Sequence, residues 1–298
     1  MTADVVIPTW NGAALLARCL RALADEPARV IVVDNASDDG TGALLAEEFP
    51  GVTVVTLGEN AGFGRAVNAG VAAGDGEAVV LVNNDVIVEP GFVAAIVAPL
   101  ADPAVGMVAG KTLLPDGSGI DAFGIALDRG LAAYNRGRWG TAGERLAMPS
   151  GGAAAYRRAA YEAAGGFDPA LFAYGEDVDL GLRLRAAGWT AAAAPAARGV
   201  HLGGATAGVD SPLQRRLGGF ARGFLLRRWG VLASAAAPRA LLVEALVVAW
   251  GLARHRTLVP LTARLAGWRA AGRGRRRVPP GAVDPAISLA LALRRLAR

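Results

Sequence analysis

Residues 2–8, Thr-Ala-Asp-Val-Val-Ile-Pro, and residues 29–34, Arg-Val-Ile-Val-Val-Asp, are β-branched runs on either side of a helical pattern at 13–24. The alternation continues along the chain, with strand-like runs at 52–57 and 78–83 and helical patterns at 40–49 and 65–74. Val/Ile-rich strands that alternate with helices are typical of a parallel sheet covered on both faces. Ligands bind such sheets beyond the carboxyl ends of the strands. The sequence therefore predicts an α/β fold with a ligand crevice at that edge.

Composition sets the class of protein. The chain has 298 residues, of which 53% are hydrophobic and 19% charged, so it can bury a large core. Cys19 is the single cysteine, which excludes an internal disulfide and favours a reducing compartment. The chain starts with a strand-like run rather than a secretory leader, and no uncharged apolar run reaches the roughly 18 residues of a transmembrane helix. We expect a cytoplasmic protein.

Charge divides the chain into two parts, which we place at 1–212 and 213–298. Residues 215–298 contain 17 arginines and two acidic residues, whereas residues 1–214 contain 14 basic and 24 acidic residues. The second part has a mostly helical pattern and an apolar segment at 240–253 flanked by arginines. This pattern fits a helix on an anionic membrane surface, and equally an ordinary helical subdomain packed on the body. We expect a peripheral position at the inner face of the plasma membrane, and no nucleic acid partner.

Acidic side chains gather at two places in the first part. Asn83-Asn84-Asp85 directly follows a buried strand-like run, and Glu176-Asp177-Val178-Asp179 opens a helical pattern at 177–187. Hard cations such as Mg²⁺ and Mn²⁺ prefer oxygen ligands and leave positions open for diphosphate oxygens. A separate carboxylate beside an acceptor hydroxyl can remove its proton. Together with His201 after the next strand-like run, the two centres predict transfer of a sugar from a nucleotide-diphosphate donor.

The acidic motifs also have ordinary structural explanations. Asp34 could bind a pyrimidine-type base, or its segment could simply be a turn in which Asp38 or Asp39 caps a helix. Asn84 and Asp85 could form a strand-end turn. Acids in the first turn of a helix favour the helix dipole, and Asp179 could pair with Arg183 one turn on.

The glycine-containing loop at 60–68 and His201 each have two interpretations as well. The loop at 60–68 brings Arg65 into position to neutralise phosphate, or it is only a tight turn. His201 could be a packed side chain, but a glycine pair at 203–204 would let it reach a metal or a phosphate. Between the two acidic motifs we expect a loop-rich acceptor side at 110–149 and a helix at 156–165.

The motifs together resemble those of family 2 glycosyltransferases, and are most similar to the rhamnosyltransferase-like bacterial members. The resemblance covers roughly residues 3–208, and its specificity lies in the order of the motifs. They are Val-Val-Ile-Pro-Thr-Trp-Asn-Gly at 5–12, Val-Val-Asp-Asn-Ala-Ser-Asp-Asp-Gly-Thr at 32–41, Asn-Ala-Gly-Phe-Gly at 60–64, Val-Asn-Asn-Asp-Val at 82–86, Gly-Gly-Phe-Asp at 165–168, Gly-Glu-Asp-Val-Asp-Leu at 175–180 and His-Leu-Gly-Gly-Ala-Thr at 201–206.

The resemblance implies a GT-A fold, a Rossmann-like, mostly parallel central sheet with flanking helices, here followed by the helical arginine-rich extension. It also implies a nucleotide-diphosphate sugar, a divalent metal ion (Mg²⁺ or Mn²⁺) and inversion at the anomeric carbon. The chain departs from the family's Asp-x-Asp motif, since asparagines occupy 83 and 84. The implied roles are nucleotide-sugar binding for Pro8, Thr9, Asn11, Asp34, Asn60, Arg65 and Asn84, metal binding for Asp85 and His201, acceptor binding for Gly152 and Glu176, and general base for Asp177.

We therefore predict an inverting, metal-dependent glycosyltransferase that acts on a cell-envelope or lipid-linked glycan, with rhamnose as the favoured sugar. Two alternatives remain. A sugar-nucleotide nucleotidyltransferase would carry a glycine-rich basic loop after its first strand, where this chain has Pro-Thr-Trp-Asn. A catalytically silent protein could keep the GT-A-like fold as a scaffold that docks at the membrane.

Overall fold

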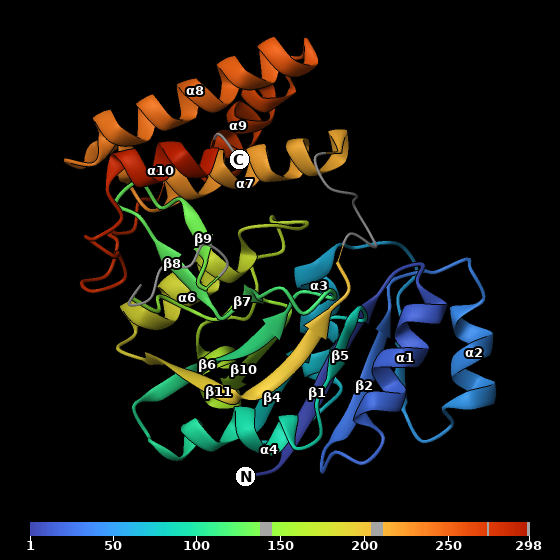
Figure 1. Ribbon diagram of the computed structural model, residues 1–298. Helices are drawn as coiled ribbons and strands as arrows, with labels where there is room; N and C mark the ends of the chain where they lie inside the picture. Colours follow the sequence, from blue (N-terminus) through green and yellow to red (C-terminus); the bar gives the residue numbers. More distant parts are fainter. Residues whose placement is uncertain (138–144, 204–210, 273, 297–298) are drawn as a thin grey trace.

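The computed structural model describes residues 1–137, 145–203, 211–272 and 274–296 (Figure 1). Its first part is a run of parallel strands joined by helices, as the sequence predicted. The strands are β1 (Ala3–Thr9), β2 (Arg29–Asp34), β3 (Thr53–Thr56) and β4 (Ala78–Val82), and the helices are α1 (Ala13–Leu23), α2 (Thr41–Glu48) and α3 (Phe63–Ala72).

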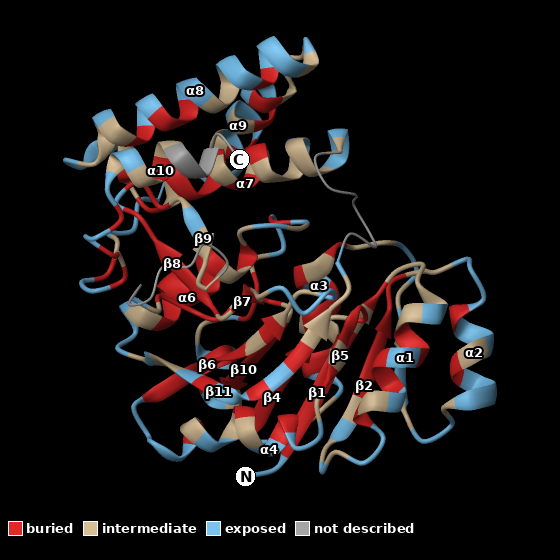
Figure 2. Ribbon diagram, viewed as in Figure 1, coloured by how far each residue is buried: buried red, intermediate tan, exposed pale blue. Residues whose placement is uncertain are grey.

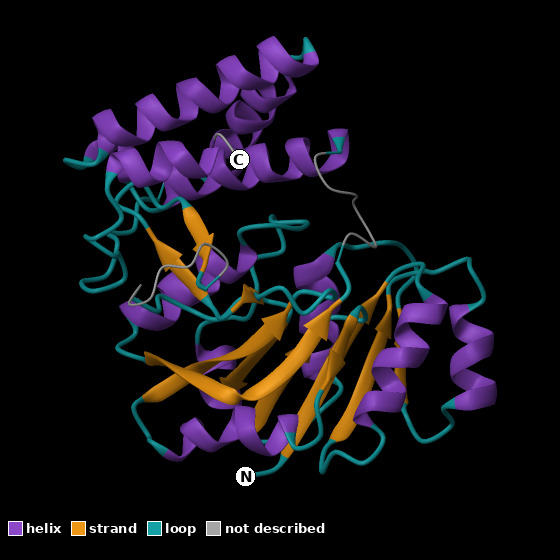
Figure 3. Cartoon of the chain, in the orientation of Figure 1, coloured by secondary structure: helices purple, strands orange, loops and turns teal. Residues whose placement is uncertain are grey.

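Beyond β4 the sheet is mixed. β10 (Ala153–Arg157) runs antiparallel to both β4 and β6 (Val105–Leu113). β11 (Thr190–His201) runs parallel to β6 and antiparallel to β5 (Val86–Val88). With β7 (Ile120–Ala122) attached to β6, the described residues form a nine-stranded sheet of order β3-β2-β1-β4-β10-β6-β11-β5. The parallel arrangement thus holds where strands and helices alternate in the sequence, and antiparallel strands enter where that alternation ends (Figure 3).

Two segments differ from the sequence-based expectation. Residues 156–165 do not form one helix, because Tyr156 and Arg157 end β10 and the helix, α5, spans Arg158–Ala163. Residues 153–156 are buried between β4 and β6, so ladder hydrogen bonds satisfy their backbone. The loop-rich region at 110–149 contains the end of β6, β7, and a separate hairpin of β8 (Ile125–Leu127) and β9 (Ala133–Asn135).

The core lies in two layers, one on each face of the sheet. Alternation along β1 sets them, since Val5 and Ile7 pack with α1 and with α4 (Phe92–Val97), which leads into the 3-10 turn η1 (Ala98–Ala101). Val6 faces the other way, toward α3, α5 and α6 (Glu176–Ala186). Strand residues on both faces are therefore buried (Figure 2), as in other sheets covered by helices on both sides. Cys19 is fully buried in the first layer, which confirms it as a packed residue.

The C-terminal region is helical, as predicted, and lies at the end of the molecule where the hairpin of β8 and β9 is found (Figure 1). The prolines at 238 and 260 stand in the first turns of helices and so start them rather than interrupt them. None of the described helices is long and apolar enough to cross a membrane. The elements are α7 (Pro212–Arg228), the 3-10 turn η2 (Val231–Ala233), α8 (Ala237–His255), α9 (Val259–Ala270) and α10 (Leu289–Leu296).

Candidate active site

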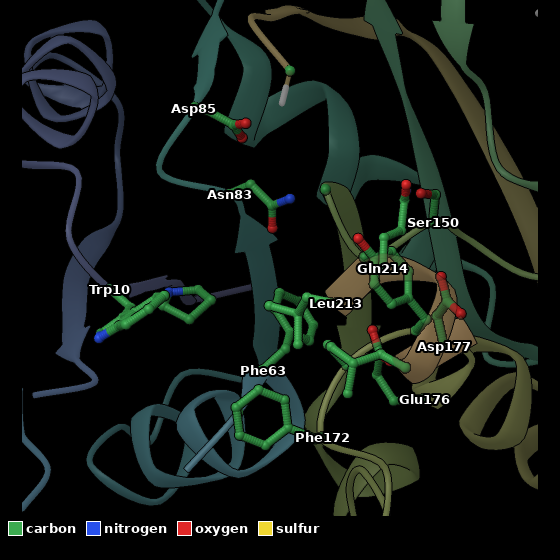
Figure 4. A pocket seen from close by; sticks show the side chains of 18 of the residues that line it. Trp10, Phe63, Asn83, Asp85, Ser150, Phe172, Glu176, Asp177, Leu213 and Gln214 are labelled. Atoms are coloured by element: carbon green, nitrogen blue, oxygen red, sulfur yellow. The ribbon is translucent and has the colours of Figure 1, made fainter. Parts of the chain in front are cut away.

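A cavity of about 1460 Å³ opens at the carboxyl ends of β1 and β4 and extends to α6 and α7 (Figure 4). In Figure 4, Asp85 lies at one end, Trp10 along one wall, and Glu176 and Asp177 on the opposite side. The two acidic centres, which are far apart in the chain, therefore share one cavity. Most of the residues singled out in the sequence line it: Pro8, Thr9, Asn60, Asn84, Asp85, Gly152, Glu176, Asp177 and His201.

Asparagine side chains tie the strand ends together at the floor of the cavity. The amide of Asn84 donates a 2.8 Å hydrogen bond to the hydroxyl of Thr9, which joins the ends of β4 and β1. A Cβ atom at Gly12 would lie 2.9 Å from that amide nitrogen, so a larger residue there would push Asn84 away. Asn84 thus orients the strand ends, and its amide nitrogen is already engaged.

Three predicted nucleotide-binding residues, Asn11, Asp34 and Arg65, are not among the residues that line the cavity. The carboxylate of Asp34 accepts a hydrogen bond from the backbone N–H of Ser37 (3.0 Å), so it stabilises the turn after β2. Asn11 accepts one from the N–H of Asp38 (2.9 Å) and links the loops after β1 and β2. The guanidinium of Arg65 is exposed and donates to the carbonyl of Pro169 (3.3 Å).

Sequence reasoning missed two residues that line the cavity beside the predicted nucleotide-binding residues. Trp10, which lies between Thr9 and Asn11 in the sequence, lines the cavity and offers an aromatic face. Asn35 holds the loop at 60–62 in place: its amide donates to the side-chain oxygen of Asn60 (3.0 Å), and its oxygen accepts from the N–H of Ala61 (2.8 Å). Both lie inside motifs quoted above, so their position next to Thr9 and Asp34 was the available signal.

His201 lies between two carboxylates. In the ladder of β5 and β11 it pairs with Val86, which brings its Nε2 to 3.3 Å from Asp85 Oδ1. Its Nδ1 lies 2.8 Å from Asp121 Oδ2 and donates a hydrogen bond to that carboxylate. The hydrogen bond with Asp121, followed by Asp85, raises the pKa of His201 to about 10. Asp121 was not predicted, and Gly204 to Thr206 of the histidine motif lie outside the described residues.

The donor atoms at this end of the cavity fit a divalent cation. Asp85 Oδ1 is buried and, apart from its ion pair with protonated His201, has no hydrogen-bond donor among the described residues. It lies 3.3 Å from His201 Nε2, and two atoms at that separation can both contact one ion at about 2.1 Å. Across the described residues no group of three or more His, Cys, Asp or Glu side chains could hold an ion. The two nitrogens of His201 contact different carboxylates, Asp85 and Asp121. A cation here would need its other ligands from diphosphate and water.

The three acids at the start of α6 have different surroundings. Asp179 is fully buried, pairs with Arg183 (2.8 Å) and accepts a hydrogen bond from the indole of Trp229 (3.1 Å), so it is structural. Glu176 and Asp177 line the cavity. Burial raises the pKa of both, but the N–H of Val178 donates to Asp177 (2.8 Å), whereas Glu176 Oε2 has no partner within the described part of the chain. Asp177 therefore ionises first.

Two helices of the C-terminal region also line the cavity, which the sequence did not reveal. We predicted the acceptor side in residues 110–149, but of that region only Leu114, Pro115, Asp121 and Asn135 are lining residues within the described part, and Trp139 lies outside it. The two helices contribute Leu213, Gln214, Arg216, Leu217 and Phe220 of α7 and Val259, Thr262, Ala263 and Ala266 of α9.

Residues 4–165 match the family model described as glycosyl transferase family 2. The chain belongs to that family. An N-acetylglucosaminyl-diphospho-decaprenol L-rhamnosyltransferase of Mycobacterium tuberculosis (strains H37Rv and CDC 1551) is 34% identical over 229 residues, which cover 66% of this chain and 75% of the relative. The succinoglycan biosynthesis protein ExoO of Rhizobium meliloti is 37% identical over 89 residues, covering 28% of this chain and 26% of that protein. The predicted resemblance is confirmed.

Solved structures show that this glycosyltransferase has the predicted GT-A fold. A mannosyltransferase from Pyrobaculum calidifontis, in complex with GDP-Man and Mn²⁺, has a TM-score of 0.59 at 24% identity, covering 91% of this chain and 75% of that one. GalNAc-T7 with UDP, GalNAc and Mn²⁺ has a TM-score of 0.62 at 16% identity, covering 90% of this chain and 55% of that one. As a member of a glycosyltransferase family, the chain is an enzyme, which sets aside the nucleotidyltransferase and scaffold alternatives.

Proposed function

We propose that this glycosyltransferase transfers a sugar, with rhamnose favoured, from a nucleotide-diphosphate donor to a lipid-linked cell-envelope glycan, with inversion at the anomeric carbon. The observation that carries the proposal is the shared cavity, which has Asp85 at one end and Asp177 on its wall. The mycobacterial relative, a rhamnosyltransferase named for a diphospho-decaprenol acceptor, supports the choice of sugar and acceptor.

The donor would lie between β1, β4 and the loop at 60–62. Trp10 offers its ring to the base, and Pro8, Thr9 and Asn60 line the same wall. Asp85 and His201 would hold a divalent cation, and His201 Nε2 gives up its proton when it does so. When bound, the cation supplies the positive charge that stabilises the leaving diphosphate. Asn11, Asp34 and Arg65 contribute through the loops that they hold.

On the acceptor side, Asp177 accepts the proton of the attacking hydroxyl. The hydroxyl oxygen bonds to the anomeric carbon as the bond from that carbon to the diphosphate breaks, and the diphosphate leaves with the electron pair. Glu176 holds its own proton more tightly, since its buried carboxyl has the weaker hydrogen bonding, and can donate it to an acceptor oxygen. Gly152 lines the cavity, where the absence of a side chain leaves space for the acceptor.

Mass-spectrometric assays test the function directly. dTDP-rhamnose, UDP-GlcNAc and GDP-mannose are each offered, with and without Mn²⁺, together with an N-acetylglucosaminyl diphosphate acceptor on a prenyl chain. We expect Mn²⁺-dependent transfer from dTDP-rhamnose, its loss in Asp177→Asn and near-normal nucleotide binding in that variant. The control is Glu162→Gln, an exposed carboxylate paired only with Arg158 at the surface. Full turnover by Asp177→Asn, or no turnover of any donor by the wild type, overturns the proposal.

A further inference from the structure

The part of the cavity bounded by α7 and α9 has an apolar lining. We call it the α7–α9 arm. Several of its large apolar side chains are open to solvent: Phe172 is 41% exposed, Tyr174 38% and Leu213 37%. The whole cavity, about 1460 Å³, exceeds the roughly 300–1,000 Å³ of ordinary small-molecule sites. A nucleotide sugar alone would leave this arm unfilled. Its apolar side chains are Phe172, Tyr174, Leu213, Leu217, Phe220, Val259, Ala263 and Ala266, and its polar ones on the two helices are Gln214, Arg216 and Thr262.

The arm contains one arginine, Arg216, that has no partner among the residues that the structure describes. Arg216 lines the cavity, is exposed, and makes no hydrogen bond or ion pair with any residue that the structure describes. Other arginines of α7 are engaged: Arg222 pairs with Glu244 (2.6 Å) and Arg228 with Asp168 (2.9 Å). Arg216 therefore keeps its full donor fork for a ligand, and a guanidinium binds phosphate in a bidentate manner.

Arg216 and the apolar wall lie on one face of α7. Positions 213, 216, 217 and 220 are spaced i, i+3, i+4 and i+7, which is the spacing of one helix face. Figure 4 shows Gln214, the neighbour of Leu213 in the chain, on the same side of the cavity as Asp177. A phosphate bound at Arg216 would thus be one helical turn along α7 from the residues next to the proposed base.

Exposed apolar side chains also lie on and beside α9. Leu261 is 39% exposed and Leu265 47%. Leu258, just before α9, is 52% exposed. Part of a hydrocarbon chain could therefore pack on α9 outside the cavity. A free polysaccharide would instead need hydrogen-bonding groups along the wall.

We infer that the α7–α9 arm binds the diphosphate and the first isoprene units of a polyprenyl-diphosphate-linked acceptor, with Arg216 on the diphosphate. The inference rests on the proposed function and assigns its acceptor to specific residues. These residues lie outside positions 4–165, which match the family model, so acceptor choice is built on a part of the chain that the family match does not cover.

Binding of farnesyl diphosphate tests the inference without requiring turnover. The titration is done with saturating dTDP and Mn²⁺, so that the donor end is filled. We expect wild type to bind farnesyl diphosphate at least about tenfold more tightly than either pyrophosphate or farnesol, since charge and chain are both recognised. Arg216→Ala should lose about tenfold in affinity, and Leu213→Asn several-fold. Arg18→Ala on α1 and Val54→Ser on β3, exposed positions away from the cavity lining, are the matched controls.

Several results would overturn the inference. If pyrophosphate binds as tightly as farnesyl diphosphate, the arm is an anion site only. If farnesol binds as tightly, the arm is an apolar surface only. If Arg216→Ala binds farnesyl diphosphate like the wild type, Arg216 does not bind the diphosphate. Failure of the proposed function is distinguished by donor turnover. If the wild type turns over dTDP-rhamnose but uses an octyl glycoside as well as the prenyl diphosphate acceptor, only the inference fails. If no sugar nucleotide is turned over while farnesyl diphosphate binds as expected, only the proposed function fails.

Discussion

Glu176 and Asp177 are neighbours in the chain, and burial raises the pKa of both. A general base must be ionised, so kcat should rise with pH through the pKa of Asp177. Because that pKa is raised, the acid limb of the profile should lie above the roughly 3.9 of an exposed aspartate. The measurement is kcat against pH between about pH 4.5 and pH 8 at saturating substrates. A rate that stays constant over this range contradicts the assignment.

The raised pKa of Glu176 also has a consequence for stability. The folded protein holds this proton at pH values where the unfolded chain has lost it, so the free energy of unfolding falls as pH rises from the unfolded pKa toward the folded one. Glu176→Gln removes this titration. We expect the free energy of unfolding of the variant to exceed that of the wild type by about 1 kcal/mol or more at pH 8, and by less at pH 4. Urea unfolding at both pH values measures this, and a difference that is larger at pH 4 would falsify it.

Asp121 should act as a positioning residue, because its carboxylate holds the ring of His201 by the 2.8 Å hydrogen bond to Nδ1. Loss of such a partner typically weakens metal binding about 10–100-fold. We therefore expect Asp121→Asn to weaken Mn²⁺ binding by this factor, measured by electron paramagnetic resonance on the free enzyme. Asp116→Asn, in an exposed turn of the same region, is the control. Equal Mn²⁺ affinity in the two variants would show that Asp121 does not orient the imidazole.

Asp85 was predicted from sequence because it directly follows a strand, where ligands bind in a parallel sheet. Asp177 was predicted because it stands in an acidic helix start preceded by a glycine. Both signals are local, since a strand or a helix begins or ends within a few residues of the side chain. Asp121 could not be found in this way. It lies on the short edge strand β7, and its partner His201 is 80 residues away in the chain. Asp34 was predicted from its motif, but it is not a lining residue of the cavity. Its carboxylate instead accepts a hydrogen bond within the turn after β2.

At the scale of elements, alanine-rich strands were the hardest to predict. The alanine-rich run at 191–194 lies in β11, where residues 191–193 pair with β6. Alanine has a low preference for strands, so the sheet environment and not local propensity decides its conformation. The strands rich in Val and Ile, β1 to β4, were predicted because their side chains favour the extended backbone by themselves.

Close packing of α7 against α9 depends on glycine. A Cβ atom at Gly223 would lie 1.9 Å from the carbonyl oxygen of Arg264, a backbone atom that cannot move alone. Gly223→Ala should therefore force the helices apart and cost about 1–3 kcal/mol. Gly218→Ala on the same helix meets nothing within 4 Å and should stabilise by about 0.5–1 kcal/mol. Thermal unfolding compares the two, and equal melting temperatures would contradict this account.

At the scale of the whole molecule, the outer surface of α8 carries large apolar side chains beside arginines. Leu241 is 55% exposed and Trp250 61% (Figure 2). We propose that this surface places the enzyme at an anionic membrane. Binding to vesicles with anionic lipid should weaken several-fold as salt rises, because screening reduces the arginine contribution. Trp250→Ser should bind less, whereas Val54→Ser, an exposed position on β3, should not. Equal binding to neutral vesicles would remove the electrostatic part of the proposal.

The division of the chain at residue 212 followed from composition and charge alone. It marks the start of α7 well, but it does not indicate that α7 and α9 complete the cavity of the first part. Such contacts depend on how distant elements pack, and neither hydrophobic periodicity nor charge encodes that arrangement. The sequence analysis therefore did not include α7 and α9 among the elements expected at the cavity.

The pairing of His201 with Val86 makes the spacing of the proposed ion-holding side chains a property of backbone registration. Successive side chains of a strand point to opposite faces, so removal of one residue from β11 would turn the imidazole away from Asp85 altogether. No small rearrangement of a rotamer could restore it. An insertion or deletion of one residue in β11 would thus remove the histidine from the site completely. Loops around the cavity can change in length without this effect. The same fold could in this way retain its binding of the leaving group while its acceptor changes.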